Sequence, residues 1–169
     1  MFGSGFRIYN AIAARPLALA LAGFILLLAM VFPPVTISSG ASMEALSEAA
    51  VKREEKAVLE AARDYLEAEV SQDHPAVFAS FAPSSPYLRT HDYAAYLGEV
   101  REAPDRLVAY NIVAVSYIQI NENKDVWPAV EKFAQVEVDM VFEYLPTAQR
   151  SEINIGLIFF KEGGKWYKS

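Results

Sequence analysis

The 169-residue chain contains no cysteine. This absence excludes a disulfide framework, a cysteine nucleophile, thiolate metal ligands and a lipid-modified N-terminal cysteine. Histidine is almost as scarce: His74 and His91 are the only two, and they are far apart in the sequence. No glycine-rich loop joins a strand to a helix in the way that phosphate binding requires. We therefore predict no metal and no cofactor, and a fold that depends on its hydrophobic core.

Acidic side chains are absent from the first 43 residues, where Arg7 and Arg15 carry the only side-chain charges. The apolar run that follows Arg15 covers 16 residues from 17 to 32, and 21 residues when it is counted through Ile37. A helix needs about 20 residues to cross the hydrocarbon core of a bilayer. The run is apolar on every side, so we predict a membrane anchor rather than a buried core helix.

The two arginines orient this anchor, because basic residues favour the cytoplasmic side. We predict a single-pass protein of the inner (cytoplasmic) membrane, with a cytoplasmic tip at 1–15, an anchor at 16–37 and a periplasmic or extracellular remainder. A cleaved signal peptide is the alternative, because small residues at 38–42 follow the apolar run. Both interpretations export the same portion. Without the two arginines, 13 basic residues face 21 acidic ones there, a net charge of about −8 that argues against nucleic acid as a partner.

The exported portion begins with helix-forming residues and then changes its period. We expect a linker and charged helical stalk at 38–56, continued by a packing helix that stops at Asp73-His74-Pro75. A short helical turn at 75–81 and a loop at 82–86 precede a second helix, capped by Thr90 or Asp92 and ending near Arg101. The apolar stripe of the packing helix comprises Val58, Ala62, Tyr65, Leu66 and Glu69 or Val70.

From Leu107 onward the apolar residues recur at every second position. Residues 133–144 alternate almost without interruption, which predicts a half-buried antiparallel strand with Asp139 on its outer face. Residues 151–161 are apolar on both faces, as in a strand that lies near the middle of the sheet or is covered on its second face, and Glu162-Gly163-Gly164-Lys165 predicts a hairpin turn. Helices followed by long strands predict an α+β fold, with a curved antiparallel sheet wrapped around the helix that carries Tyr65.

This order of elements, with Phe78-Ala-Ser-Phe-Ala-Pro83 and the ending Phe159-Phe-Lys-Glu-Gly-Gly-Lys-Trp-Tyr-Lys168, resembles the nuclear transport factor 2-like (cystatin-like α+β cone) superfamily. The resemblance covers about 57–169. It implies a cone whose concave sheet face and helices enclose an apolar pocket. Members of the superfamily include enzymes, ligand binders and interaction modules, so the fold alone does not choose a function.

Candidate site residues follow from this expected cone. We assign no catalytic residue, because both histidines fall at predicted helix boundaries, where capping explains them. Trp127, on a polar loop, is either tucked against the core or an interface anchor. Aromatic residues that would line a pocket are Tyr65, Phe78, Tyr96, Tyr117, Phe142 and Tyr144.

We therefore expect a membrane-tethered accessory or assembly domain of a bacterial envelope that binds a protein partner or a second copy of itself. The alternative is a pocket protein that binds a small apolar ligand, or a cyclase or isomerase. A carboxylate or imidazole beside several tyrosine hydroxyls favours the alternative. A cone centre filled by the side chains of Tyr65, Phe78, Phe142 and Phe159 argues against it.

Overall fold

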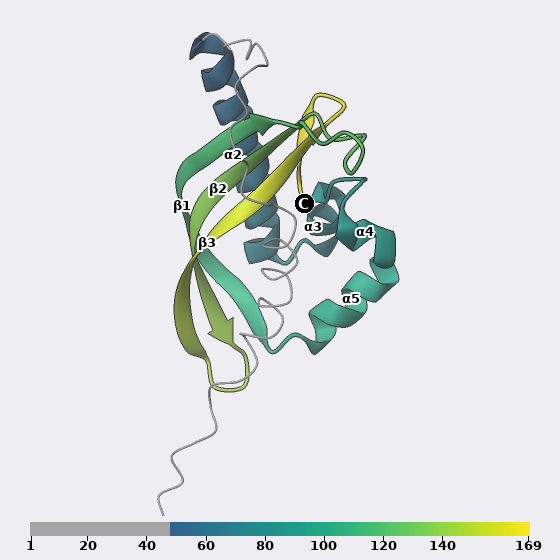
Figure 1. Ribbon diagram of the computed structural model, residues 1–169. Helices are drawn as coiled ribbons and strands as arrows, with labels where there is room; N and C mark the ends of the chain where they lie inside the picture. Colours follow the sequence, from purple (N-terminus) through teal and green to yellow (C-terminus); the bar gives the residue numbers. More distant parts are fainter. Residues whose placement is uncertain (1–47) are drawn as a thin grey trace, which may run out of the picture. The chain divides into compact units, whose positions relative to one another are not determined.

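A computed structural model describes residues 48–169 of the chain (Figure 1). The cytoplasmic tip predicted for 1–15, the membrane anchor predicted for 16–37 and the linker up to residue 47 lie outside the described residues. Within 48–169, no helix has both the length and the apolar character needed to cross a membrane.

The described part opens with α2 (Glu48–Ser71), a long helix without glycine or proline. Val58, Ala62 and Leu66, spaced four residues apart, are fully buried and confirm the predicted stripe. Gln72 adopts a left-handed φ of 58° directly after the helix, and Asp73 caps the next one. α2 therefore ends close to Asp73-His74-Pro75, where the sequence predicted that the helix would stop.

Three short helices follow, α3 (His74–Ser80), α4 (Pro86–Thr90) and α5 (Tyr93–Glu102), and each begins with a side-chain cap. Asp73 Oδ1 accepts a hydrogen bond from the N–H of Ala76 at 3.1 Å, and Asp92 Oδ1 accepts one from Ala95 at 2.8 Å. The sequence did not predict α4. Ser85 caps it and Pro86 begins it, a pair that the loop-forming composition of 82–86 concealed.

The second half of the chain is an antiparallel sheet of four strands in sequential order, β1 (Asp105–Ile120), β2 (Lys132–Tyr144), β3 (Gln149–Glu162) and β4 (Lys165–Lys168). Gly163 and Gly164 form the predicted hairpin, with left-handed φ values of 56° and 79° that two-residue turns of this kind need. The α+β class and the antiparallel pairing are thus confirmed. β3 is the third of four strands in the sheet order, but only its residues 159–162 pair with β4, so the interior position predicted for 151–161 holds for the end of that range.

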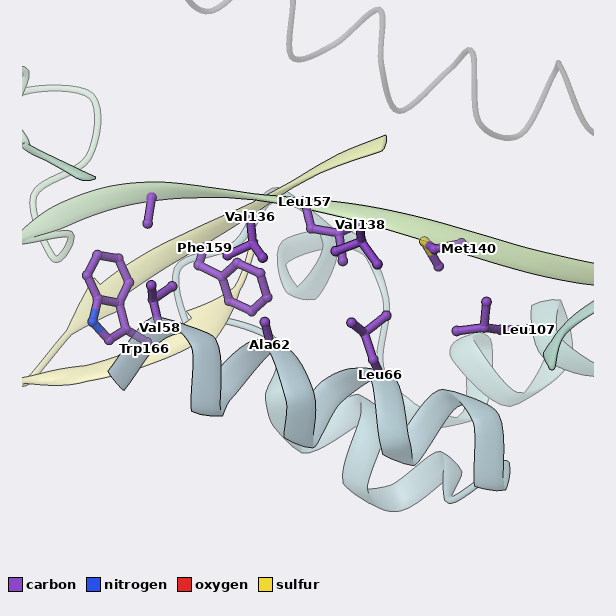
Figure 2. Close-up of a cluster of buried hydrophobic side chains, with 11 residues drawn as sticks. Val58, Ala62, Leu66, Leu107, Val136, Val138, Met140, Leu157, Phe159 and Trp166 are labelled. Carbon is purple, nitrogen blue, oxygen red and sulfur yellow. The ribbon is translucent and has the colours of Figure 1, made fainter. Parts of the chain in front are cut away.

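The main core lies between α2 and one face of the sheet, hereafter the inner face (Figure 2). Alternate residues of β2 are buried on this face, and Val136 and Val138 have no exposed surface. Phe159 on β3 is the largest fully buried side chain, and Figure 2 shows its ring between the sheet and Ala62. Burial of such a side chain contributes about 2 to 3 kcal/mol.

β1 is the irregular member of the sheet. Its register against β2 shifts between Leu107 and Ala109, between Ile112 and Ala114, and between Val115 and Tyr117. Each extra residue bends the strand and increases its twist. These three shifts explain why a 16-residue strand curves around α2 instead of leaving it.

Candidate functional site

A second, smaller group of buried side chains lies between α2 and the short helices, which Figure 1 shows on one side of α2. Tyr96 is only 6% exposed, and the ring of Phe78 lies 5.5 Å from it between centroids. Tyr65 packs against both this group and the main core, with its ring 6.4 Å from that of Phe81. The corner is therefore largely aromatic, and it places phenol hydroxyls in a dry environment.

A carboxylate joins these phenols. Tyr65 is hydrogen-bonded to Glu69, one turn further along α2. Burial raises the pKa of Glu69, and the hydrogen bond from Tyr65 and the charges at His74 and Lys168 oppose that shift only in part. Burial also raises the pKa of Tyr65 well above its usual value. We call Tyr65, Glu69, His74 and Lys168 the Glu69 cluster.

Lys168 supplies the amine of this cluster. It is 6% exposed, and its Nζ donates a hydrogen bond to the main-chain oxygen of Ser169 at 2.8 Å. Its backbone is held by pairing with Phe159 and by the N–H of Ala82, which donates to the Lys168 carbonyl at 2.7 Å. Burial lowers the pKa of Lys168 to about 8. A carboxyl, a phenol and an amine with shifted pKa values thus lie close together, as sites of proton transfer require.

A second polar group lies further out on the same helices. The Tyr87 hydroxyl donates to Glu99 Oε2 at 2.7 Å, and His91 Nε2 lies 3.0 Å from Glu99 Oε1. The His91 ring stacks on that of Tyr87 at 4.3 Å. Both histidines lie at helix boundaries as predicted, because His74 begins α3 and His91 follows α4. His91 Nδ1 lies 3.2 Å from the carbonyl oxygen of Tyr87 in α4, and the His74 ring packs edge to face against Tyr96 at 6.2 Å.

A charged cluster stands at the other end of the packed part of α2. Glu54 Oε1 accepts hydrogen bonds from Lys132 Nζ at 2.8 Å and Lys161 Nζ at 2.7 Å, while Trp166 Nε1 donates to Glu54 Oε2 at 3.1 Å. Burial by itself would raise the pKa of Glu54, but the hydrogen bonds and charges of the two lysines outweigh it and hold the pKa at about 2. We call these four residues the Glu54 cluster.

The Glu54 cluster corrects one expectation. The sequence placed Glu54 among the solvated charges of a stalk at 38–56, whereas its side chain is only 15% exposed. The carboxylate joins α2 to β2, β3 and β4 through one group. Sequence spacing contained the signal, because Glu54 precedes Val58 by four residues and so continues the buried stripe.

The predicted pocket residues separate into three places. Tyr65, Phe78 and Tyr96 come together between α2 and the short helices. Phe142 packs against the main core from the inner face, and Tyr144 ends the same strand. Tyr117 pairs with Gln135, between the inner-face residues of β2, so it lies on the outer face and cannot line the same space as the others.

Trp127 is half-buried in an aromatic group on the loop between β1 and β2. Its ring lies 5.1 Å from Phe160 and 6.4 Å from Phe133, and Asn121 Nδ2 donates to its carbonyl at 2.7 Å. The guanidinium of Arg89 lies 5.6 Å from the ring centroid. The indole is therefore tucked back on the sheet.

The acid in the middle of β2 lies on the outer face, as predicted. Asn154 Nδ2 donates to Asp139 Oδ1 at 2.7 Å, and Asn111 Nδ2 donates to Oδ2 at 3.2 Å. These hydrogen bonds lower the pKa of Asp139. Across residues 48–169, no three histidine, aspartate or glutamate side chains are grouped as metal binding requires.

The sequence did not single out Lys168 or assign a chemical role to Glu69. Lys168 follows Trp166 by two residues, which places both on one face of β4. Glu69 was one of two alternatives, with Val70, for the last position of the apolar stripe on the packing helix. Spacing thus indicated burial for both.

Comparisons with known proteins add no identity: the chain matches no protein-family model, and no curated protein or solved structure matches it.

Proposed function

We propose that this protein is a membrane-tethered, extracytoplasmic accessory or assembly domain that acts through protein–protein interaction. The observation that carries this proposal is the filled centre of the inner face. Phe159, Leu66 and Val136 are fully buried where a cone would hold a ligand. The main core therefore serves packing, and the chemistry available for recognition lies on the surface.

We further propose that residues 57–169 form a nuclear transport factor 2-like cone. Three observations support it: helices precede the strands, the register shifts curve β1, and the Glu-Gly-Gly hairpin brings Trp166 into the core at 3% exposure. The tether itself is proposed from the apolar run at 16–37 and from Arg7 and Arg15 before it.

A second candidate function is favoured by the Glu69 cluster. A carboxyl with a raised pKa, hydrogen-bonded to a phenol and near a buried amine, suits recognition of the polar group on a small apolar ligand. The same groups suit proton transfer in a cyclase or isomerase. This candidate requires a ligand to enter the aromatic corner around Tyr96.

One experiment tests the first proposal. Chemical crosslinking of the full chain in native membranes, followed by mass spectrometry, is expected to recover a stable partner or a dimer of this chain. Monomeric chain without a crosslinked partner contradicts interaction as the function.

The second candidate predicts a different result. Native mass spectrometry of the purified full chain is expected to show a bound small molecule that Glu69→Gln and Lys168→Met both remove. Glu55→Gln, on an exposed position of the same helix, is the matched control. Unliganded protein together with a recovered protein partner favours the first proposal alone.

A further inference from the structure

The two edges of the sheet differ in length and charge. β4 forms part of one edge with four residues, two of which are lysines, and Phe81 bridges to Lys168 beside it. β4 pairs only with residues 159–162 of β3, so the earlier part of β3, which carries Arg150 and Glu152, completes that edge. β1 forms the other edge with 16 residues and pairs with β2 alone among the described strands (Figure 1). From Leu107 to Ile120, 14 consecutive residues of β1 include no charge and no proline.

Edge strands present unpaired N–H and C=O groups, and soluble proteins commonly protect them with lysine, proline or shortness. β4 has two of these protections, whereas β1 has none of the three, and its protection is limited to the bends at its register shifts. The register shifts bend β1 but place no charge on it. Apolar side chains are exposed along it, with Val113 at 48% and Ile120 at 52%. The edge is therefore suited to pairing with another strand.

We propose that β1 pairs antiparallel with β1 of a second copy, so that one sheet continues across two chains. This inference rests on the proposed function, since it names the partner of an interaction domain. The exported portion carries a net charge of about −8, so two copies repel each other wherever their acidic surfaces meet. The uncharged strand avoids this repulsion.

Self-pairing also follows from the composition of the edge. A strand that selects a charged partner needs complementary charges, and Leu107 to Ile120 has none. A two-fold axis relates identical strands in antiparallel order, which is the arrangement already present throughout this sheet. The midpoint of the uncharged run lies between Val113 and Ala114. We place the two-fold axis at Val113, so that this residue faces its own copy and facing residues have numbers that add up to 226.

Single cysteines test this arrangement with little background, because the chain has none of its own. Facing residues of antiparallel strands have Cα atoms about 4.5 to 5.5 Å apart, within reach of a disulfide. Mild oxidation of the full chain in native membranes is expected to join Val113→Cys into a dimer. Co-expression of differently tagged Ala109→Cys and Tyr117→Cys chains, whose cysteines replace residues on the outer face, is expected to yield mostly mixed dimers. Leu145→Cys, 51% exposed at the turn after β2, is the matched control and should stay monomeric.

A charge variant supplies an independent measurement. Val113→Lys brings two ammonium groups together at the two-fold axis and should lower the dimer fraction about tenfold, whereas Leu145→Lys should leave it unchanged. Circular dichroism of each variant checks that the fold is retained.

The outcomes separate this inference from the function that it extends. Disulfide dimers through Leu145→Cys but not through Val113→Cys overturn the pairing of β1 and leave an interaction domain. Crosslinks from Val113→Cys to a different protein would show that β1 binds that protein and not a second copy of this chain, and the proposed function as an interaction domain would stand. Monomers with no crosslinked partner at any position overturn both.

Discussion

Glu54 and Glu69 are on the same helix, 15 residues apart, and their surroundings move the pKa of the same chemical group in opposite directions. Glu54 accepts hydrogen bonds from two lysines and an indole N–H, and its pKa falls to about 2. Glu69 accepts a hydrogen bond from the Tyr65 phenol, and burial raises the pKa of Glu69. The number of positive partners in direct contact, and not burial alone, decides the direction.

The consequence is a division of roles along α2. At the Glu54 end, a charged carboxylate holds the helix to three strands. At the Glu69 end, a carboxyl that readily accepts a proton lies beside Tyr65 and Lys168. A group fixed in one charge state stabilises structure, whereas a group with a shifted pKa in an aromatic corner is available for chemistry.

A substitution in the hydrophobic core, which lies between the Glu54 end and the Glu69 end of α2, is expected to have the largest effect on stability. Phe159→Ala deletes a fully buried ring and is expected to lower the free energy of unfolding by about 3 to 5 kcal/mol. Urea unfolding of the full chain in detergent, followed by tryptophan fluorescence, measures it. Val126→Ala, at a 51% exposed position outside the proposed interface, should change stability by less than about 0.5 kcal/mol. A loss below about 1 kcal/mol for Phe159→Ala would mean that the centre is loosely packed, and would revive a pocket there.

Breaking the Glu54 cluster is the next largest change. Glu54→Ala leaves Lys132 and Lys161 without their shared carboxylate and should cost about 3 kcal/mol, the low end for buried pairs, because all three side chains retain 15 to 17% exposure. Because the pKa of Glu54 is lowered, its contribution is present above the usual pKa near 4.5 and is lost as the pH falls through about 2. The free energies of unfolding of wild type and Glu54→Ala should therefore become equal as the pH falls to about 2. Glu55→Ala should match wild type, and an equal loss there would show that the effect does not depend on the contacts of Glu54 with the two lysines.

The sequence predicted the helices and strands that carry Glu54 and Glu69 better than it predicted the contacts of these two side chains. Four-residue spacing in α2 and two-residue alternation in β2 predicted both elements and the faces that they bury, because regular periods map directly onto geometry. The short helix α4 was missed, because a Ser-Pro pair serves loops and helix starts alike. Five residues give no periodic signal with which to decide.

The charged residues were harder to place for a physical reason. Glu54 and Lys161 are 107 positions apart and meet only because β3 passes beside α2. Spacing on the helix indicated that Glu54 and Glu69 could be buried, but the lysines that contact Glu54 come from β2 and β3, and the amine of the Glu69 cluster comes from β4. Tyr117 shows the same limit, since the last register shift in β1 moved it to the outer face.

Lys168→Met tests the Glu69 end through the pH dependence of stability. The pKa of Lys168 is lowered to about 8, so the unfolded chain binds a proton between pH 8 and 10 that the folded chain does not. The free energy of unfolding should therefore rise with pH in this window, by about 2 kcal/mol. Lys168→Met should abolish the rise, and Lys165→Met, on an exposed residue of the same strand, should keep it. Equal slopes in all three proteins would contradict a buried amine.

The smallest change removes one hydroxyl from the Glu69 cluster. Tyr65→Phe keeps the ring that packs against Phe81 and deletes the hydrogen bond to Glu69, at a cost of about 1 kcal/mol. The same hydrogen bond lowers the pKa of Glu69 against the effect of burial, so the variant should raise that pKa further. Carbon-detected NMR titration of labelled glutamate measures the shift, and Glu54 in the same spectra should titrate unchanged. Tyr93→Phe, which removes a hydroxyl from the rim of the same aromatic corner, is the control. A Glu69 that titrates identically in both variants would show that burial alone sets its pKa, and the contrast with Glu54 would then depend only on the two lysines.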